Sequence, residues 1–343
     1  MNWPRTLSRR DLLWRASIGA LAGLVGARAG AARIPRIGLA VLGSSGPAGN
    51  GANSAHVWMD VLRRRGLHDG KNVEYVVLQP WGGDLRRYAD NVRDVVTLSP
   101  DVIISNSTLH TRAVQKATST IPVVFVNVAD PLSAGFVQSL GKPGGNITGV
   151  AVHNLTLFPK RLQLIRELLP AARQVGLIID GAFVRNGFPP SFYEEMRQMA
   201  KSLDLALIEI DVERMAGGID EAFQNAAAKR VDMVLPLGPW PSVKQLDFWW
   251  REGQWKYRIP VMWFAPYRGG PLDDVLVQYG VTVEEMMEHA VEIVLLILKG
   301  VHPRDIPVRQ ADKVELIFNL KAAQELGISV PMHLLARANR IIE

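Results

Sequence analysis

Polar side chains follow two apolar runs of the sequence, at places where a small molecule can be bound. The segment 105–110 comes directly after one run of Val and Ile, and Ala129–Pro131 follows the next such run. In an open parallel sheet the loops beyond the carboxyl ends of the strands meet along one edge, and ligands bind there. Hydroxyl and amide groups can hydrogen-bond a carboxylate, and a carboxylate can pair with an ammonium group. The two segments therefore suit an ionised small molecule.

The polar side chains of these segments also have structural interpretations. Asp130 can pair with a ligand ammonium group in a desolvated cleft, or it can cap a helix that begins at residue 132 or 133. Asn106, Ser107 and Thr108 are candidate ligand contacts, and the two hydroxyl groups can instead cap a helix from residue 111 onward. We interpret His110 as a rim or structural histidine. Both interpretations stay open for Asp130, Ser107 and Thr108.

A glycine-rich loop, Gly43–Gly51, follows the first apolar run, where a nucleotide-binding loop would lie. Its spacing is not G-x-G-x-x-G, Pro47 interrupts the turn, and neither Walker spacing nor its lysine is present. The loop leads into a helix expected near Ser54, whose free backbone N–H groups can hold a carboxylate. Ser44 and Ser45 are therefore candidate ligand contacts, and the alternative is an ordinary connection.

The second half of the chain places aromatic and polar side chains in its predicted strand-end loops. Aromatic rings can stack there on a planar or apolar part of a ligand, although each can equally pack within the protein. Arg185 and Asn186 lie in a loop where no structural need for them is evident. The complete set of candidate ligand-binding residues is Ser44, Ser45, Asn106, Ser107, Thr108, Asp130, Phe183, Arg185, Asn186, Trp240, Tyr267 and Tyr279.

The residue types of common catalytic and metal sites are missing or scattered. The chain has no cysteine, which excludes disulfides, thiolate metal sites and a cysteine nucleophile. None of its seven histidines has another histidine or a cysteine at metal-ligand spacing. No G-x-S-x-G elbow is present, and no serine can be tied to a base. We therefore expect no catalytic residue, no metal and no cofactor.

Short runs rich in Val and Ile alternate with longer segments of helical period, which predicts parallel sheets flanked by helices. Such runs recur in both halves of the chain. The predicted fold is α/β, with two doubly wound parallel-sheet lobes at residues 30–152 and 153–280. Residues 281–343 are expected to cross between the lobes and complete both, so that several chain segments form the hinge.

Local signals in the last part of the chain predict particular elements. Thr282 and Glu285 have the spacing of a capping box, and the apolar stretch Ala290–Leu298 indicates a helix packed in the core. A strand is expected at Ile306–Val308. The segment Asn319–Gly327 has the start and stop signals of a short helix.

Length and composition place the chain among globular proteins. At about 150 residues per domain, 343 residues correspond to roughly two domains, and 48% hydrophobic with 21% charged residues is ordinary for a folded protein. The formal charge is +6, but five of the 39 cations and one of the 33 anions lie within residues 1–29. The remaining 34 cations and 32 anions nearly balance, which argues against a nucleic-acid partner.

Residues 1–29 have the features of an export signal, with a basic start, an apolar run at Ala16–Ala27 and small residues at its end. The run of about 12 residues is too short to span a membrane, which needs roughly 20. The pair Arg9–Arg10 resembles a twin-arginine signal, with general secretory export as the alternative. Because the chain has no cysteine to carry a lipid anchor, we expect a soluble periplasmic protein.

Two stretches of the sequence carry a resemblance to a known family. The first is ATSTIPVVFVNVADPLSAGFVQSLGKPGGNITGV from Ala117, and the second is ILKGVHPRDIPVRQADKVELIFNLKAAQELGISVPMHLLARANRIIE from Ile297. A further match is the tripeptide at 278–280. These stretches resemble the substrate-binding proteins of ABC transporters, of the tryptophan or aromatic amino-acid-binding type. The resemblance covers nearly all of the chain after the export signal.

The resemblance implies a type I periplasmic binding fold, in which two lobes close on a small ligand like a Venus flytrap. The family's polar loop after the third strand falls on Ser107–Thr108, its Asp-Pro on Asp130–Pro131 and its Tyr-Gly on Tyr279–Gly280. The chain departs from the family at residues 180–186, where the family commonly has an Asn-Pro loop, and its later loop reads Gly238–Pro241. This departure leaves the identity of the ligand open.

These observations together predict a periplasmic solute-binding receptor of an ABC importer. It would capture a small organic solute, such as an amino acid or a related carboxylate with or without an aromatic group. It would deliver the solute to an inner-membrane ABC permease with its ATPase, and no bond would be made or broken. We expect a monomer that binds no nucleic acid. Two other classes stay open: a ligand-sensing subunit for a membrane sensor kinase or chemoreceptor and, less favoured, an exported α/β enzyme.

Overall fold

The structure of the protein is a computed structural model, which describes residues 33–41, 55–78, 85–152, 156–181, 190–215, 217–237, 246–266 and 271–343. The export signal expected at residues 1–29 lies outside the described residues. Seven of the candidate ligand contacts also lie outside them: Ser44, Ser45, Phe183, Arg185, Asn186, Trp240 and Tyr267.

Six parallel strands form the first sheet, in the order β11-β5-β4-β3-β1-β2. Their bounds are β1 Arg36–Ala40, β2 Glu74–Val77, β3 Val102–Asn106, β4 Val123–Val128, β5 Ile147–Val152 and β11 Arg309–Ala311. The chain runs from β1 outward to β2 and then returns past β1 to β3, β4 and β5, which makes the sheet doubly wound. The central strands are continuous runs of buried residues because both faces of the sheet are covered.

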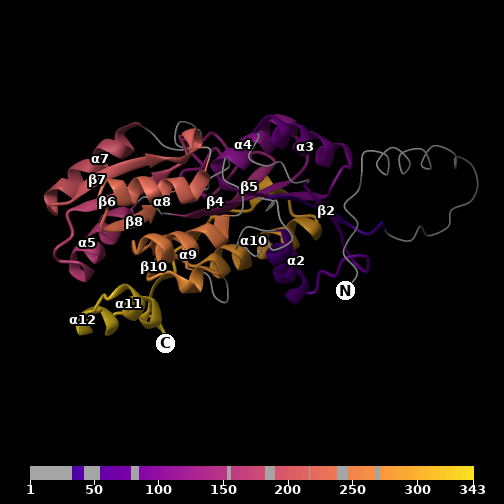
Figure 1. Ribbon diagram of the computed structural model, residues 1–343. Coiled ribbons are helices and arrows are strands. Elements are labelled where there is room, and N and C mark those ends of the chain that lie inside the picture. Colours follow the sequence, from indigo (N-terminus) through magenta and orange to yellow (C-terminus); the bar gives the residue numbers. More distant parts are fainter. Residues whose placement is uncertain are drawn as a thin grey trace, which may run out of the picture.

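Helices cover both faces of the first sheet (Figure 1). The bounds are α2 Ala55–Arg64 and α10 Val283–Leu298 on one face, and α3 Leu85–Thr97 and α4 Ser107–Ala117 on the other. Successive residues of β1 point to opposite faces. Leu39 belongs to the apolar cluster of α2 and α10, whereas Ala40 belongs to the cluster of α3 and α4. The Val and Ile runs therefore fill two separate layers.

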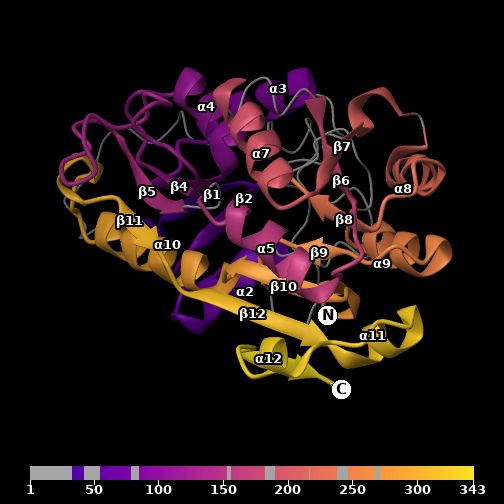
Figure 2. The same ribbon diagram turned by 90° about the vertical axis from the view of Figure 1, so that its left-hand side faces the viewer.

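The second sheet consists of two groups of strands, β7-β6-β8 and β13-β12-β10-β9, which an isolated bridge between Val234 and Val261 connects. The bounds are β6 Gln174–Ile179, β7 Ala206–Asp211, β8 Met233–Pro236, β9 Met262–Trp263, β10 Val277–Val281, β12 Val314–Asn319 and β13 Arg340–Ile342. Strands β6, β7 and β8 are parallel, as are β9 and β10, whereas β12 is antiparallel to β10. Figure 2 shows β12 alongside β10, with α11 and α12 beyond it.

The helices of the second half also lie on both faces of their sheet. The α-helices are α5 Phe158–Leu168, α7 Pro190–Ser202, α8 Gly218–Ala228, α9 Leu246–Tyr257, α11 Leu320–Leu326 and α12 Met332–Leu335. Short 3-10 helices are η1 Val212–Arg214, η2 Pro271–Asp274 and η3 Pro303–Asp305. Helices α5 and α7 pack with Val175, Leu177 and Ile179 of β6 in one cluster, whereas α8 packs with Ile178 in the other. The predicted α/β fold with doubly wound sheets is confirmed.

The chain passes between the two sheets at three places: from β5 to α5, from β10 to α10 and from β11 to β12. Helix α10 packs on β3, β4 and β5 of the first sheet, although it directly follows β10 of the second. Strand β11 then pairs with β5, and β12 pairs with β10. One apolar cluster runs from α2 of the first half to α8 of the second, and α10 belongs to it.

Several predicted element ends differ from the structure. The predicted core helix at Ala290–Leu298 and the short helix between Asn319 and Gly327 are confirmed, with Asn319 Oδ1 accepting from the N–H of residue 322 and Gly327 at a left-handed φ of 73°. The capping box is wrong, because Thr282 makes no side-chain capping bond and Glu285 accepts from the N–H of residue 313 instead. The strand predicted at Ile306–Val308 begins later, at β11, after Pro307.

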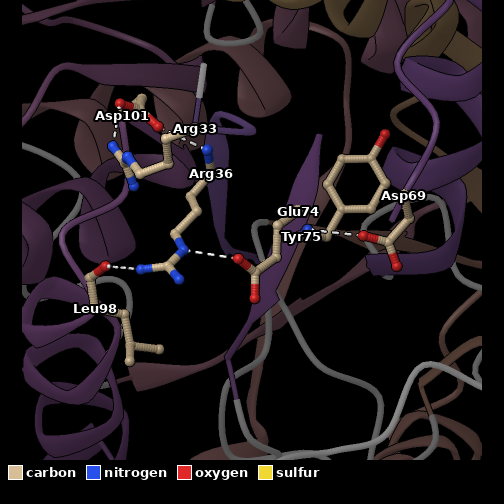
Figure 3. Close-up of polar contacts among 7 residues, drawn as sticks. All are labelled: Arg33, Arg36, Asp69, Glu74, Tyr75, Leu98 and Asp101. Carbon is tan, nitrogen blue, oxygen red and sulfur yellow. Dashed lines mark hydrogen bonds and ion pairs between the residues drawn. The ribbon is translucent and has the colours of Figure 1, made fainter. Parts of the chain in front are cut away.

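A polar network fixes the amino-terminal edge of the first sheet (Figure 3). Asp101 accepts hydrogen bonds from the Arg36 N–H at 2.7 Å and from Arg33 Nη2 at 2.6 Å. The Arg36 side chain pairs with Glu74 Oε2 at 2.7 Å and donates to the Leu98 carbonyl at 3.1 Å. These groups lie where β1, β2 and β3 begin. They are therefore at the edge opposite to the predicted strand-end site.

We expect the substitution Gly149→Ala to destabilise the protein by at least about 2 kcal/mol, because a Cβ at this position in β5 would overlap the Phe125 carbonyl oxygen of β4. The control Gly145→Ala adds a Cβ that meets nothing within 4 Å, and its effect should stay within about 0.5 kcal/mol. Chemical denaturation of both variants gives the comparison. Equal losses in the two variants would contradict the close approach of β4 and β5.

Candidate ligand-binding site

The turn between β3 and α4 contains three of the candidate ligand contacts. Asn106 ends β3 with extended backbone, and Ser107 has a φ of 75°, in the left-handed region that residues other than glycine rarely adopt. Helix α4 begins at Ser107, four residues earlier than the helix start expected at residue 111. Ser107 and Thr108 therefore lie in the first turn of the helix. The backbone N–H groups of such a turn have no partner within the helix.

A chain of buried hydrogen bonds holds this turn in place. Ser105 Oγ and Thr111 Oγ1 are 2.9 Å apart, and Thr111 Oγ1 donates to the Ser107 carbonyl at 2.8 Å. His110 Nδ1 lies 3.0 Å from Ser107 Oγ and in short contact with the Asn106 carbonyl oxygen. Since a carbonyl only accepts, Nδ1 must carry the ring proton. The network ties both ends of the strained turn to the core.

His110 is fully buried, which agrees with the structural interpretation and not with a position at the rim. Burial lowers its pKa to about 4, so the ring is neutral at physiological pH. It packs on Tyr88, with the ring centroids 4.6 Å apart, and the Tyr88 hydroxyl donates to the Ala40 carbonyl at 3.2 Å. The histidine therefore connects the turn after β3 with the end of β1.

Thr108 and Asp130 follow neighbouring strands of the first sheet. Because β3 pairs with β4 in parallel, their carboxyl ends lie at one edge. Among the described residues, Thr108 Oγ1 has no hydrogen-bond partner, and its side chain is half-buried. Asp130 is exposed, and its Oδ1 accepts from the Ser133 N–H at 2.9 Å. The structure thus brings a hydroxyl and a carboxylate to the same edge.

Asp130 caps a turn and not the helix expected from residue 132 or 133. Hydrogen bonds from the side chain and backbone of Ser133 lower the pKa of Asp130, which outweighs the smaller effect of burial. The carboxylate is therefore ionised at neutral pH. Capping engages one carboxylate oxygen with the Ser133 N–H, which is compatible with a second role for the charge.

Tyr279 lies within β10 of the second sheet, opposite Leu316 of β12. Its ring packs against the apolar cluster of α5 and α7, as in the packing alternative. Burial raises the pKa of its hydroxyl, with Arg161 and Arg337 acting in the opposite direction. The sequence predicted that the Tyr279 side chain contacts the ligand. In the structure, the backbone carbonyl of Tyr279 accepts a hydrogen bond from Arg161.

Arg161 of α5 is fully buried and binds the backbone of β10 and of the residue that follows β9. Its Nε donates to the Tyr279 carbonyl at 3.1 Å and its Nη2 to the Phe264 carbonyl at 3.2 Å. Burial lowers its pKa to about 10, so it stays a cation at neutral pH. A Cβ on Gly280 would overlap the Phe264 carbonyl oxygen, so glycine permits this close approach. Sequence reasoning missed Arg161, and only the glycine inside the strand marks the contact.

Two carboxylates lie at the corresponding edge of the second sheet. Asp180 follows β6 and is fully buried, and Asp211 ends β7. Asp211 Oδ1 accepts from the Gly181 N–H at 2.8 Å and from the Glu213 N–H at 3.1 Å. Asp211 therefore joins the ends of β6 and β7. The sequence pattern identifies the loop but not this carboxylate.

The described residues contain no group of three or more His, Asp or Glu side chains suited to hold a metal ion. Within the same part of the chain, no helix combines the length and the apolar character that a membrane span requires.

Two doubly wound α/β sheets, between which the chain passes more than once, have the architecture of type I periplasmic binding proteins. Residues 54–342 match the family described as ABC transporter substrate binding protein, and the chain belongs to this family. The resemblance noted in the sequence is thereby confirmed.

Known relatives agree with this assignment. The chain is 25% identical over 267 residues to a tyrosine-binding protein of Clostridioides difficile, covering 76% of this chain and 73% of the relative. A conserved domain protein of Vibrio cholerae has a similar structure, with a TM-score of 0.74 and 24% identity over 90% of this chain and 100% of its own. A Streptococcus ABC domain solved with L-Trp has a TM-score of 0.71 and 21% identity over 90% of this chain and 99% of its own.

We expect the stability of the wild type to fall by about 3 kcal/mol more than that of His110→Gln between pH 7.5 and pH 4, because the pKa of this histidine drops from 6.5 unfolded to about 4 folded. Below about pH 6.5 this histidine is protonated in the unfolded chain, whereas the buried ring of the folded protein stays neutral down to about pH 4. Denaturation at several pH values measures the difference. The control His68→Gln changes an exposed histidine and should keep the wild-type dependence of stability on pH. If the stability of the wild type and of His110→Gln depends on pH in the same way, the buried neutral ring is refuted.

We expect Arg161→Gln to lower the free energy of unfolding by roughly 2–4 kcal/mol, because two buried carbonyl groups lose charged donors. The exposed Arg63, changed to Gln, serves as the control and should change stability by no more than about 0.5 kcal/mol. Urea denaturation tests both variants. A loss for Arg161→Gln no larger than the control's would argue against its role at β9 and β10.

Proposed function

We propose that the protein is a periplasmic receptor that binds a free amino acid, with an aromatic one favoured, and passes it to an inner-membrane ABC permease with its ATPase. Membership of the substrate-binding family carries this proposal. A relative named for tyrosine binding and a similar structure solved with L-Trp support the ligand class. Members of this family bind solutes, so the proposed receptor makes and breaks no bond.

The proposed lobes are residues 30–152 and 153–280, with residues 281–343 completing both. The pairing of β11 with β5 and of β12 with β10 supports this division. A ligand that touches both lobes favours the closed state only by its excess affinity for that state. A shift from 1:99 to 99:1 needs about 5.5 kcal/mol, within the roughly 8 kcal/mol of a micromolar ligand.

The carboxylate of the amino acid is proposed to bind at the turn between β3 and α4. The backbone N–H groups of the first turn of α4 and Thr108 Oγ1 are suitable donors, and the helix dipole favours an anion there. The ammonium group is proposed to pair with ionised Asp130 on the neighbouring strand end. The aromatic and polar candidates outside the described residues remain predicted contacts of the rest of the ligand.

A thermal-shift screen of the twenty amino acids, simple aromatic acids, sugars and polyamines tests the ligand class. A ligand at 100 times its dissociation constant adds about 2.7 kcal/mol of stability, which raises the melting temperature measurably. We expect tryptophan, tyrosine or phenylalanine to give the largest shift. A screen in which sugars or polyamines shift the protein and amino acids do not would overturn the proposal.

Matched variants test the proposed contacts. Asp130→Asn keeps an oxygen for the Ser133 N–H but removes the charge, and Thr108→Val keeps the shape but removes the hydroxyl. Each should reduce the shift caused by a ligand at least several-fold, and the melting temperature of the empty protein should fall slightly for Asp130→Asn, whose Ser133 contact loses its charge, and not for Thr108→Val. The exposed residues Asp60 and Thr120, changed to Asn and Val, are the controls.

A further inference from the structure

Helices α3 and α4 lie side by side on the outer face of the first sheet (Figure 1). Between them is a hollow with a volume of about 420 Å³, which we call the α3–α4 groove. Its lining residues are Tyr88, Ala89 and Arg93 of α3, and Leu109, Arg112, Ala113, Lys116 and Ala117 of α4. The volume lies in the range of small-molecule sites, which is roughly 300–1,000 Å³.

The charged side chains that line the α3–α4 groove are all cations: Arg93, Arg112 and Lys116. The two helices together contain five Lys or Arg residues and two Asp, and α4 contains no acidic residue. Residues 30–343 contain 34 cations and 32 anions, and the two helices account for five of these cations and two of these anions. Without α3 and α4, this segment has slightly more anions than cations. The two helices therefore carry a net positive charge, and three of their five cations line the groove.

The position of Arg112 on α4 does not serve the stability of the helix. Arg112 and Lys116 are four residues apart, so they are like-charged neighbours on one helix face, an arrangement that destabilises a helix. Lys116 complements the dipole in the last turn, but Arg112 lies in the middle of the helix. An anion bound between the two side chains would relieve their repulsion.

Contacts beside the groove orient one cation and leave the others exposed. The Arg112 guanidinium lies 4.9 Å from the centre of the Phe136 ring, which limits its freedom. Arg93 pairs with Asp90 one turn earlier at 2.6 Å, but both side chains are 69% and 65% exposed, so this pair is weak. The guanidinium fork of Arg112 suits carboxylate or phosphate oxygens.

Small side chains form the apolar part of the groove. Ala89, Ala113 and Ala117 leave space between the helices, and Leu109 adds apolar surface. A ligand can therefore approach the helices closely while its charged groups meet the cations. No lining residue carries a carboxylate that would repel it.

We propose that the α3–α4 groove binds a compact polyanion, with two or more carboxylate or phosphate groups close together, through Arg112 and Lys116. The groove uses other residues of α4 than the strand-end site, and its proposal does not depend on the amino-acid proposal. Because the hollow of about 420 Å³ has the volume of a small-molecule site, the polyanion is a free small molecule.

Isothermal titration of the full chain at low ionic strength tests the groove with two probes, inorganic tripolyphosphate and an acetylated tetraglutamate peptide. We expect tripolyphosphate to bind one-to-one and more tightly than the peptide, with affinity that falls as salt is added. The double variant Arg112→Gln with Lys116→Gln should bind at least tenfold more weakly. Tighter binding of the peptide would overturn the assignment of the groove to a free small polyanion.

The matched control changes Lys229 and Arg230, two exposed cations after α8, to Gln. The control should retain wild-type affinity for the probe, and all variants should keep the wild-type melting temperature within about two degrees, as expected of surface changes. If tripolyphosphate does not bind, or if the control loses as much affinity as the groove variant, the proposal is wrong. The amino-acid thermal shift, measured on the same proteins, reports separately on the strand-end site.

Discussion

Burial of α10 against the first sheet is the interaction on which the two-sheet arrangement depends. Ala290, Val291 and Ile293 of this helix are fully buried in the same apolar cluster as Trp58 of α2. A parallel sheet needs cover on both faces, and α10 supplies much of it on one face. Because the helix follows β10 of the second sheet, burying it forces the chain to return to the first sheet.

Most of the fold could be predicted from sequence because strands covered on both faces appear as continuous Val and Ile runs. The runs VIIS and VVFVNV, for example, correspond to β3 and β4. The last part of the chain was harder. Neither β12 nor β13 is predicted, since β12 contains the buried Glu315, paired with Lys313 at 3.0 Å, and β13 has only three residues. The capping-box prediction failed because Glu285 accepts a hydrogen bond from the N–H of residue 313 and not from the start of its own helix.

The strand-end rule predicted where Thr108 and Asp130 lie, because it depends only on the order of strands and loops. It could not predict the hydrogen bonds that shape the site. Arg161 acts on the carbonyls of residues more than one hundred positions later, and in sequence it is one more basic residue of an amphipathic helix. The left-handed Ser107 likewise depends on the buried His110, which no local pattern distinguishes from a surface histidine.

The return of the chain to the first sheet has a consequence for biosynthesis. Strand β11 ends at residue 311, so the β5 edge of the first sheet stays unpaired until the first 311 residues have been synthesised. An amino-terminal fragment that ends before residue 283 would lack α10, which covers one face of the first sheet. Neither half can therefore be exchanged between relatives as a continuous segment. A chimera would need a junction at each of the three places where the chain passes between the sheets.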